Sequence, residues 1–486
     1  MTTSDLVGLA GILVAIGLII WLAYRGFSLL LAAPLAALVA AAFAGEPLLA
    51  HWTQTLMAGA GRFIVQFFPL FLLGAVFGKL MDDSGSALAI ARAITGRMGA
   101  ARAVIAVVLA CALLTYGGVS LFVVSFALYP VADALFRQAA VPHRLIPPAI
   151  ALGSFSFTMT ALPGTPAIQN AIPMPYFGTT IFAAPGLGVV AAAVILGFGL
   201  WWLGRVEAAA RRNGEGYGPD AHATPDAELV RERATDTDAF DPAELPHGHH
   251  SERIPSFMIA VAPIPVVLAV NLSMTWLVLP RVDTSFLAEA RWGGISLQAV
   301  SGIWSVVTAL IVASVVLVLL NRRRLPELRK SLDAGANAAV LPIFNVASLA
   351  GFGAVVAALP AFVAVRDGLL ALPGGPLVSM TVAAGVMGVV TASASGALII
   401  TLNTFGETYA RLAAEAGIDP ALMHRVAALA SGPLAQLPHS GAIATLLSIC
   451  GATMQKSYRD IAMVILVGPL LALVVAIALG KAFGSF

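Results

Sequence analysis

The chain consists largely of apolar runs of about 20 residues, and these runs decide what it can fold into. Only helices or a closed barrel can cross lipid, and the runs lack the two-residue alternation of barrel strands. Hydrophobic residues make up 59% of the chain and charged residues 11%. A soluble protein of this composition would have too few polar residues to cover its apolar surface. The sequence therefore predicts an all-α polytopic membrane protein of the bacterial-type cell inner membrane.

The predicted spans form two halves on either side of a polar stretch. The spans of the first half lie near 5–24, 27–45, 62–82, 102–136 (broken), 146–172 (broken) and 181–204. Those of the second half lie near 254–275, 298–320, 333–358, 374–412 (broken), 421–449 (broken) and 460–482. The polar stretch has the composition of a flexible linker, and lysines and arginines in the short loops place it in the cytoplasm. We therefore expect a first membrane repeat over 1–204, a cytoplasmic linker over 205–253 and a second membrane repeat over 254–486.

The two halves have the same order of elements, which indicates an internal repeat. Each has three spans, a re-entrant hairpin, a broken span and a final span. The clearest match aligns 162–168 with 437–443, where four of seven residues are identical. Basic residues flank the first hairpin more heavily than the second, so the repeats are expected to be inverted. Inverted repeats with paired broken helices are typical of secondary transporters, whose binding sites lie at the midplane.

Four breaks in the spans form the predicted substrate site. Unwound backbone at membrane depth is tolerated only where it is buried in protein or lines a wet cavity. The N-terminus of a half-helix also offers N–H groups and a partial positive charge to a carboxylate. The predicted substrate-binding residues are Gly117, Gly118, Ser120, Pro163, Gly164, Thr165, Ser395, Gly396, Pro438, His439 and Ser440. Close helix packing is the competing explanation for small residues at such places.

Two residues, His439 and Glu407, are candidates for ion coupling. His439 falls within a predicted break, where it can take up a proton or simply shape the loop by hydrogen bonding. Glu407 and Asp133 lie in hairpin arms, where an ionised carboxylate is energetically unfavourable unless it is paired or hydrated. Each has an arginine one helical turn later, Arg411 and Arg137 respectively, and a structural pair is the simpler interpretation of both.

The sequence has no motif for enzymatic chemistry. H-E-x-x-H, G-x-S-x-G and the phosphate-binding G-x-x-x-x-G-K-[ST] are all missing, so we expect neither an enzyme nor a bound cofactor or metal. The net charge is +2, and the basic residues do not cluster into a face that could bind nucleic acid. Nucleic acid is therefore not an expected partner. Cys111 and Cys450 lie in apolar runs and are expected to be buried thiols.

Two short motifs resemble the gluconate permease family of gluconate–proton symporters. They are FGKLMDDSG at 77–85 and LAYRG at 22–26. The segment LPGTP at 162–166 also looks like the Gly-Thr-Pro break of the wider ion-transporter superfamily. The family implies proton-coupled uptake of a small hydroxy-carboxylate. The superfamily implies re-entrant hairpins, a dimeric scaffold and an elevator-type movement of a transport domain. The gluconate branch tends to carry a histidine with the prolines of the first break, whereas 163–166 has none.

The sequence thus predicts a symporter that imports a small hydroxy-monocarboxylate, such as gluconate or 3-hydroxybutyrate, with protons. The expected partners are this organic anion, a proton or a sodium ion, the lipid bilayer and a second copy of the chain. A sodium-coupled di- or tricarboxylate carrier is the main alternative, but it would need fixed positive charge, and no arginine or lysine falls in the four breaks. An anion channel is a further alternative, although a channel does not require paired broken helices.

Overall fold

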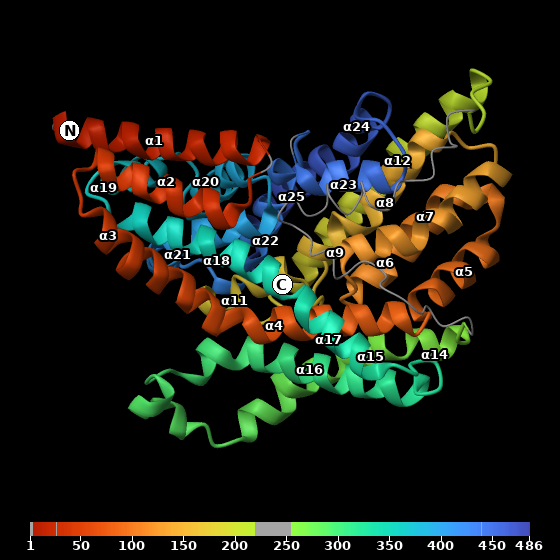
Figure 1. Ribbon diagram of the computed structural model, residues 1–486, viewed down its shortest axis with the longest axis horizontal. Coiled ribbons are helices and arrows are strands. Elements are labelled where there is room, and N and C mark those ends of the chain that lie inside the picture. Colours follow the sequence, from red (N-terminus) through yellow and green to blue (C-terminus); the bar gives the residue numbers. More distant parts are fainter. Residues whose placement is uncertain (1–2, 26, 219–253, 439) are drawn as a thin grey trace.

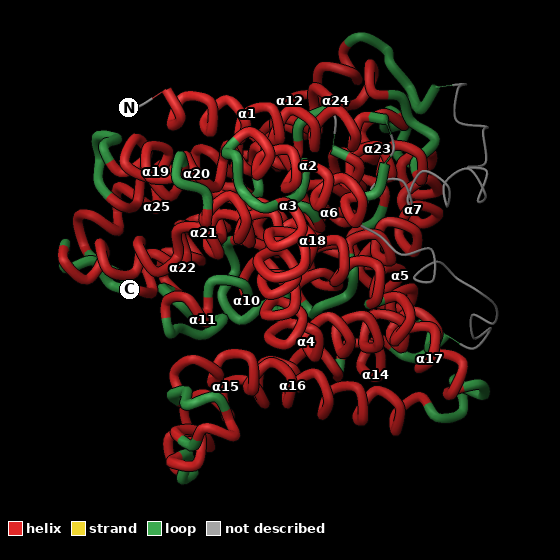
Figure 2. The backbone as a smooth tube through the Cα atoms, turned by 60° about the vertical axis from the view of Figure 1, so that its left-hand side comes forward, coloured by secondary structure: helices red, strands yellow, loops and turns green. Residues whose placement is uncertain are grey.

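The computed structural model describes residues 3–25, 27–218, 254–438 and 440–486. Within these ranges the chain forms only helices and loops, as Figure 2 shows. Seven of the described helices are long and apolar enough to cross a membrane, or eight if the pair Ser86–Met98 and Ala100–Tyr116, bent by 103°, is one span. The predicted all-α polytopic fold is confirmed, whereas the two repeats, their inversion and the domain boundaries stay predictions.

The helices follow the predicted spans in order. Those of the first half are α1 Thr3–Tyr24, α2 Leu29–Phe43, α3 Leu48–Ala50, η1 His51–Leu56, α4 Met57–Asp83, α5 Ser86–Met98, η2 Ala100–Arg102, α6 Ala103–Tyr116, α7 Leu121–Gln138, η3 His143–Leu145, α8 Ile146–Ser154, α9 Phe157–Thr160, α10 Ile168–Ala171, α11 Met174–Phe177 and α12 Pro185–Arg212. The main difference is the third span, which begins before residue 62 because α3, η1 and α4 run on without a break from Leu48.

The second half follows the central stretch and is also built of helices in its described residues. Its helices are α14 Phe257–Val261, α15 Pro263–Ser273, η5 Met274–Val278, η6 Leu279–Arg281, η7 Ser285–Ala288, η8 Ala290–Trp292, α16 Leu297–Asn321, α17 Leu328–Ala338, α18 Val340–Ala358, α19 Phe362–Leu370, α20 Pro376–Thr391, α21 Ala394–Glu415, α22 Pro420–Ser431, η9 Pro433–Gln436, α23 Gly441–Ile449, α24 Met454–Ala462, η10 Met463–Val467 and α25 Gly468–Phe483. Local signals begin several of them. The side chain of Asp419, for example, accepts a hydrogen bond from the backbone N–H of Ala421 at 2.8 Å and caps α22.

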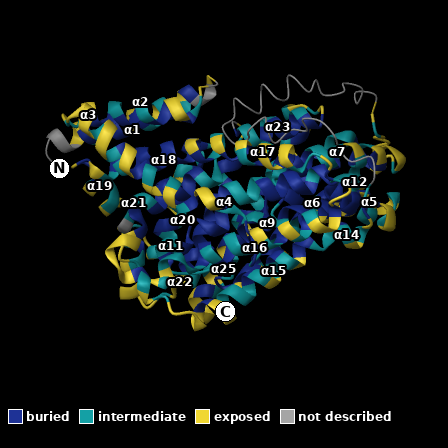
Figure 3. Cartoon of the chain, turned by 60° about the horizontal axis from the view of Figure 1, so that its bottom comes forward, coloured by how far each residue is buried: buried dark blue, intermediate teal, exposed yellow. Residues whose placement is uncertain are grey.

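The helix α4 lies at the centre of the molecule and joins the two halves. The second-half helices α16, α17 and α18 pack against it, and α18 also packs against α2 and α21. Figure 1 shows α4 crossing the middle of the body, with α1 and α2 on one side and α15 and α16 on the other. Figure 3 shows that buried residues are concentrated within the helical body and exposed residues at its edges. The core is therefore shared between the halves, which brings the hairpins of both toward one place.

The last span of the first half runs past the predicted boundary at 204. Helix α12 continues to Arg212, and the residues after it dock on the loop before α8. Arg144 donates two hydrogen bonds to Glu215, at 2.7 and 2.9 Å, and a third to Asp460 at 2.8 Å. The backbone N–H of His143 donates to the carbonyl oxygen of Tyr217 at 3.1 Å. The first part of the predicted linker is thus a fixed part of the fold.

This docking predicts a pH-dependent local stability. Hydrogen bonds from the Arg144 guanidinium hold the pKa of Glu215 below its ordinary value. A lowered pKa means that the carboxylate stabilises the docked state above its ordinary pKa, and that this contribution is lost as the pH falls through the lowered value. At neutral pH we expect Glu215→Gln to raise the hydrogen-exchange rate of the His143 amide about two- to fivefold, the range of a partly exposed ion pair.

Hydrogen-exchange mass spectrometry of the purified protein checks this expectation. Glu207→Gln is the matched control, because Glu207 pairs with Arg211 within α12 and does not touch the loop. The difference between Glu215→Gln and the unaltered protein should shrink as the pH falls below the ordinary glutamate pKa of about 4.3 and vanish only below the lowered pKa of the paired carboxyl group. Equal exchange in all three proteins at neutral pH would show that Glu215 does not hold the loop.

Candidate functional site

The first hairpin turns between α6 and α7, at residues 117–120. Gly118 has a φ of 97°, in the left-handed region that favours glycine. A Cβ atom at this position would lie 2.9 Å from Cγ of Pro166, so the tip is pressed against the segment that begins α10. Ser120 is the N-cap of α7. The turn therefore exposes the positive end of the α7 dipole at the hairpin tip.

The second hairpin turns more tightly, with only Ala392 and Ser393 between α20 and α21. The Ser393 hydroxyl accepts a hydrogen bond from the backbone N–H of Gly396 at 3.2 Å and caps α21. The predicted role of Gly396 as a backbone donor to the substrate is therefore taken by this cap. The first-turn N–H groups of α21 that remain for a ligand are those of Ala394 and Ser395.

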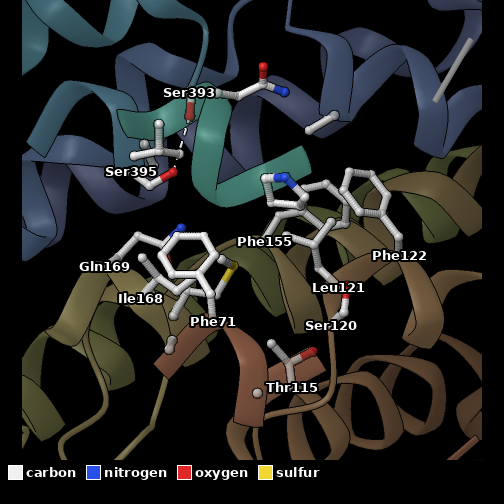
Figure 4. A pocket seen from close by; sticks show the side chains of 18 of the residues that line it. Phe71, Thr115, Ser120, Leu121, Phe122, Phe155, Ile168, Gln169, Ser393 and Ser395 are labelled. Atoms are coloured by element: carbon white, nitrogen blue, oxygen red, sulfur yellow. Dashed lines mark hydrogen bonds between the residues drawn. The ribbon is translucent and has the colours of Figure 1, made fainter. Parts of the chain in front are cut away.

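A cavity of about 240 Å³ lies between the two tips. Its hydrogen-bonding side chains come from both halves: Thr115, Ser120, Thr160, Gln169, Asn345, Thr391, Ser393, Ser395 and Gln436. Figure 4 shows Ser393 and Ser395 on one side of it and Thr115 and Ser120 on the other, with the rings of Phe71 and Phe155 between them. None of the described residues that line it is charged. Its volume is below the range of pockets for drug-sized ligands, which favours a small solute.

Three polar atoms in this cavity wall are buried without a hydrogen-bond partner among the described residues. They are Oγ1 of Thr115, Oε1 of Gln169 and Oε1 of Gln436. The three side chains are 4%, 8% and 9% exposed. Leaving a buried polar group unsatisfied costs about 1–3 kcal/mol. Water or a polar ligand in the cavity can therefore form the hydrogen bonds that these three atoms lack.

The structure brings some of the predicted site residues together and leaves others aside. Gly118, Ser120 and Ser395 line the cavity. The described residues that do not line it are Gly117, Pro163, Gly164, Thr165, Gly396, Pro438 and Ser440. His439 lies outside the described residues. The assignment of the substrate site stays a prediction.

The break after α9, residues 161–167, is fixed by hydrogen bonds at Pro163 and Gly164 and reaches the cavity wall at its end, through Pro166 and Ala167. The hydroxyl of Tyr116 donates to the carbonyl oxygen of Pro163 at 2.9 Å, which ties the break to the first hairpin. The backbone N–H of Gly164 donates to the carbonyl oxygen of Ile181 at 2.9 Å, and Thr165 is fully buried. The N–H of Gly164, which was predicted as a donor to the substrate carboxylate, is therefore already used within the protein.

The break before α23 supports the second hairpin in a similar way. The Ser440 hydroxyl donates to the carbonyl oxygen of Ala392, in the hairpin turn, at 3.3 Å. Ser440 itself is fully buried, and the cavity is reached instead by Gln436, at the end of η9. The described residues of this break thus position the second tip and do not line the cavity themselves.

The acids of the hairpin arms lie away from the cavity. Glu407 is exposed on α21, and Arg411 pairs with Glu415 at 2.8 Å instead of with Glu407. Asp133 does pair with Arg137, at 3.4 Å. The structure therefore does not bring Glu407, predicted for ion coupling, to the site.

Sequence reasoning missed Gln169 and Gln436, although the chain carries a signal for both. Each glutamine stands in a largely apolar segment close to a break, and Gln169 is followed by a second amide, Asn170. A polar side chain inside a membrane span is costly and marks a functional position. Glycine, proline and hydroxyl groups mark the breaks themselves, whereas these two amides lie just beside them.

Comparisons with known proteins place similar chains among membrane transporters. Residues 164–479 match the Na⁺/H⁺ antiporter family, and residues 6–205 match the GntP family permease. The chain is 40% identical over 458 residues to a Bacillus subtilis (strain 168) transporter named YxjC. The alignment covers 93% of this chain and 94% of that protein. The fold is similar to the crystal structure of the Alcanivorax borkumensis YdaH transporter, with a TM-score of 0.51 and 13% identity, over 90% of this chain and 89% of that one.

Proposed function

The chain belongs to the GntP permease and Na⁺/H⁺ antiporter families of membrane transporters, and we propose that it imports a small hydroxy-monocarboxylate together with protons. As a member of these families it is a permease and not an enzyme. It is also a multi-pass protein of the bacterial-type inner membrane. The substrate, the coupling ion and the mode of movement form the proposal.

The observation that carries the proposal is the cavity between the two hairpin tips. The positive ends of α7 and α21 both reach it, and a carboxylate is stabilised by such helix ends. The unsatisfied oxygens of Thr115, Gln169 and Gln436 can each accept a hydrogen bond, and the hydroxyl group of a hydroxy acid is a donor. One carboxylate and at least one hydroxyl group in a small molecule match this set of groups.

The coupling ion and the movement are proposed on the resemblance to gluconate–proton symporters and to their superfamily. We assign proton uptake to His439, which falls in the break before α23, and we expect an elevator-type movement within a homodimer. Because Glu407 is exposed and outside the cavity, it is the weaker of the two coupling residues.

Uptake by the purified protein in liposomes tests the proposal. Radiolabelled 3-hydroxybutyrate and gluconate should accumulate severalfold when an inward proton gradient is imposed, and an inward sodium gradient alone should not drive uptake. His439→Gln should abolish accumulation driven by the proton gradient. Liposomes without protein provide the baseline.

Three outcomes would overturn parts of this proposal. Sodium-driven accumulation of citrate or succinate, without hydroxy-monocarboxylates, would establish the di- or tricarboxylate alternative. Single-channel currents carried by the anions would establish a channel. Full proton-driven accumulation by His439→Gln would show that the histidine is structural.

A further inference from the structure

Four acidic or basic residues with permanent charge at neutral pH are buried in the described part of the chain, and one of them has no ionic partner. They are Lys79, Asp83, Arg425 and Asp460. Lys79 pairs with Asp83 at 2.9 Å, and Asp460 pairs with Arg144 at 2.8 Å. Arg425 is fully buried in the middle of α22 and has no carboxylate within 4.0 Å among the described residues. A buried charge without a counter-ion is strongly unfavourable, so this exception requires an explanation.

The guanidinium of Arg425 bonds only to neutral acceptors. It donates to the carbonyl oxygen of Ala183 through Nε at 3.1 Å and through Nη2 at 2.7 Å. Its Nη1 donates to the carbonyl oxygen of Thr160 at 3.3 Å and to Oδ1 of Asn170 at 3.1 Å. These bonds fix the position of the charge but do not neutralise it.

The neighbouring histidine does not supply the missing negative charge. The Asn170 amide nitrogen donates to two backbone carbonyls, so its oxygen must be the atom that faces Arg425 and His424. This oxygen lies 3.2 Å from Nε2 of His424 and can only accept a hydrogen bond there. A neutral imidazole with its proton on Nε2 meets this pattern, with Nδ1 accepting from the Thr179 hydroxyl at 2.7 Å. The cluster of Arg425, His424, Asn170 and Thr179 then carries one net positive charge.

This charge lies directly behind the wall of the cavity. Thr160, whose carbonyl oxygen accepts from Arg425, lines the cavity, and so does Gln169, the residue before Asn170. Gly432 lines it too, and it follows Arg425 by seven residues, which places the two on the same side of the helical segment. One layer of protein therefore separates the guanidinium from the cavity, which itself has no charged lining residue among those described.

We propose that Arg425 is the fixed positive charge that makes this cavity select a monoanion. The proposal rests on the proposed function and adds the group that recognises the charge of the substrate. A single negative charge in the cavity balances the single charge of the cluster, whereas a neutral molecule leaves it unbalanced and a dianion exceeds it. Arg425 is a positioning and specificity-determining residue in this proposal, because it acts through the wall without touching the substrate.

The test compares a carboxylate with its amide, which has nearly the same shape and no charge. Binding of 3-hydroxybutyrate and 3-hydroxybutyramide, and of acetate and acetamide, is measured by thermal shift on the purified protein. In the unaltered protein each acid should bind at least tenfold more tightly than its amide. In Arg425→Met the acid should lose roughly 10- to 100-fold in affinity, the size expected of one unit charge at this range and an effective dielectric constant of about 20. The affinity for the amide should change less than threefold.

Two further variants distinguish an effect of the Arg425 charge on binding from an effect of Arg425 on the structure. Arg425→Lys keeps the charge and should retain most of the preference for the acid, although it loses hydrogen bonds as the methionine variant does. Arg62→Met is the control, because Arg62 is exposed on α4 and does not line the cavity. Equal loss of acid and amide binding in both Arg425 variants would mean that the arginine is only structural, and so would an unchanged preference in Arg425→Met.

The outcomes also distinguish this inference from the proposed function. One outcome is that 3-hydroxybutyrate and 3-hydroxybutyramide do not bind, whereas acetate binds more tightly than acetamide and Arg425→Met removes that preference. The proposed substrate would then be wrong, and the role of Arg425 would hold. If the Arg425 variants do not fold, the unaltered protein still gives a test, because a fixed positive charge behind the cavity requires each acid to bind more tightly than its amide. Equal binding of acids and amides by the unaltered protein overturns the inference.

Discussion

Replacing Gly118 with alanine is expected to reduce uptake about 100-fold or more while leaving membrane insertion intact. The left-handed φ of 97° costs an alanine about 1–2 kcal/mol, and its Cβ would lie 2.9 Å from Cγ of Pro166. The tip must then move away from Pro166 and carry the N-terminus of α7 with it. A displacement of this kind by a fraction of an ångström to about 1 Å is enough for a 100-fold loss. Uptake in liposomes is the measurement.

Gly45→Ala is the matched control for this substitution. Gly45 also has a left-handed φ, of 71°, but a Cβ atom there meets nothing within 4 Å. It therefore carries the backbone strain without the collision and should transport at nearly the normal rate. Normal transport by Gly118→Ala would show that the first hairpin tip has no part in the site.

Gly74→Leu is expected to abolish substrate binding by filling the cavity. Gly74 lies on α4 and lines the cavity, and a Cβ atom there meets nothing within 4 Å. Leucine also favours a helix more than glycine does, so the substitution should not unfold α4. In a cavity of about 240 Å³ a leucine side chain occupies the space of the substrate, and we expect a loss of affinity of about 100-fold or more.

Gly61→Leu tests whether this effect depends on the cavity. Gly61 lies on the same helix, also has open space at its Cβ position and does not line the cavity. Thermal shift with 3-hydroxybutyrate and uptake in liposomes should therefore be close to normal in Gly61→Leu. Similar losses in both variants would point to α4 packing, and normal binding by Gly74→Leu would place the substrate elsewhere.

The helices could be predicted from the sequence because the signal for each is local. A continuous apolar run long enough to span lipid specifies a helix on its own, and glycine or proline within it marks the break. All four breaks lie where such residues interrupt an apolar run. This local signal could not place the second turn exactly, because the capping bond from Gly396 to Ser393 depends on the conformation of Ala392.

The cavity could be predicted only in part because its wall is made by contacts between distant segments. The sequence shows Gln169 and Gln436 as polar residues in apolar runs, but not that their amides meet the hairpin tips in one space. In the sequence Arg425 is likewise only one of the basic residues near the second hairpin, with Arg411. Only the packing of α22 against Thr160 and Ala183 reveals that this arginine is buried without a carboxylate.

The packing of α18 between α2, α4 and α21 has a consequence for how the protein is made. While the ribosome synthesises residues 84–327, α2 and α4 are already inserted, but α18, which packs against both, does not yet exist. At bacterial translation rates this interval lasts on the order of tens of seconds. The nascent first half must therefore remain in the bilayer with its future interior facing lipid. A gene split in the central stretch should yield functional protein only when both fragments are synthesised in the same cell.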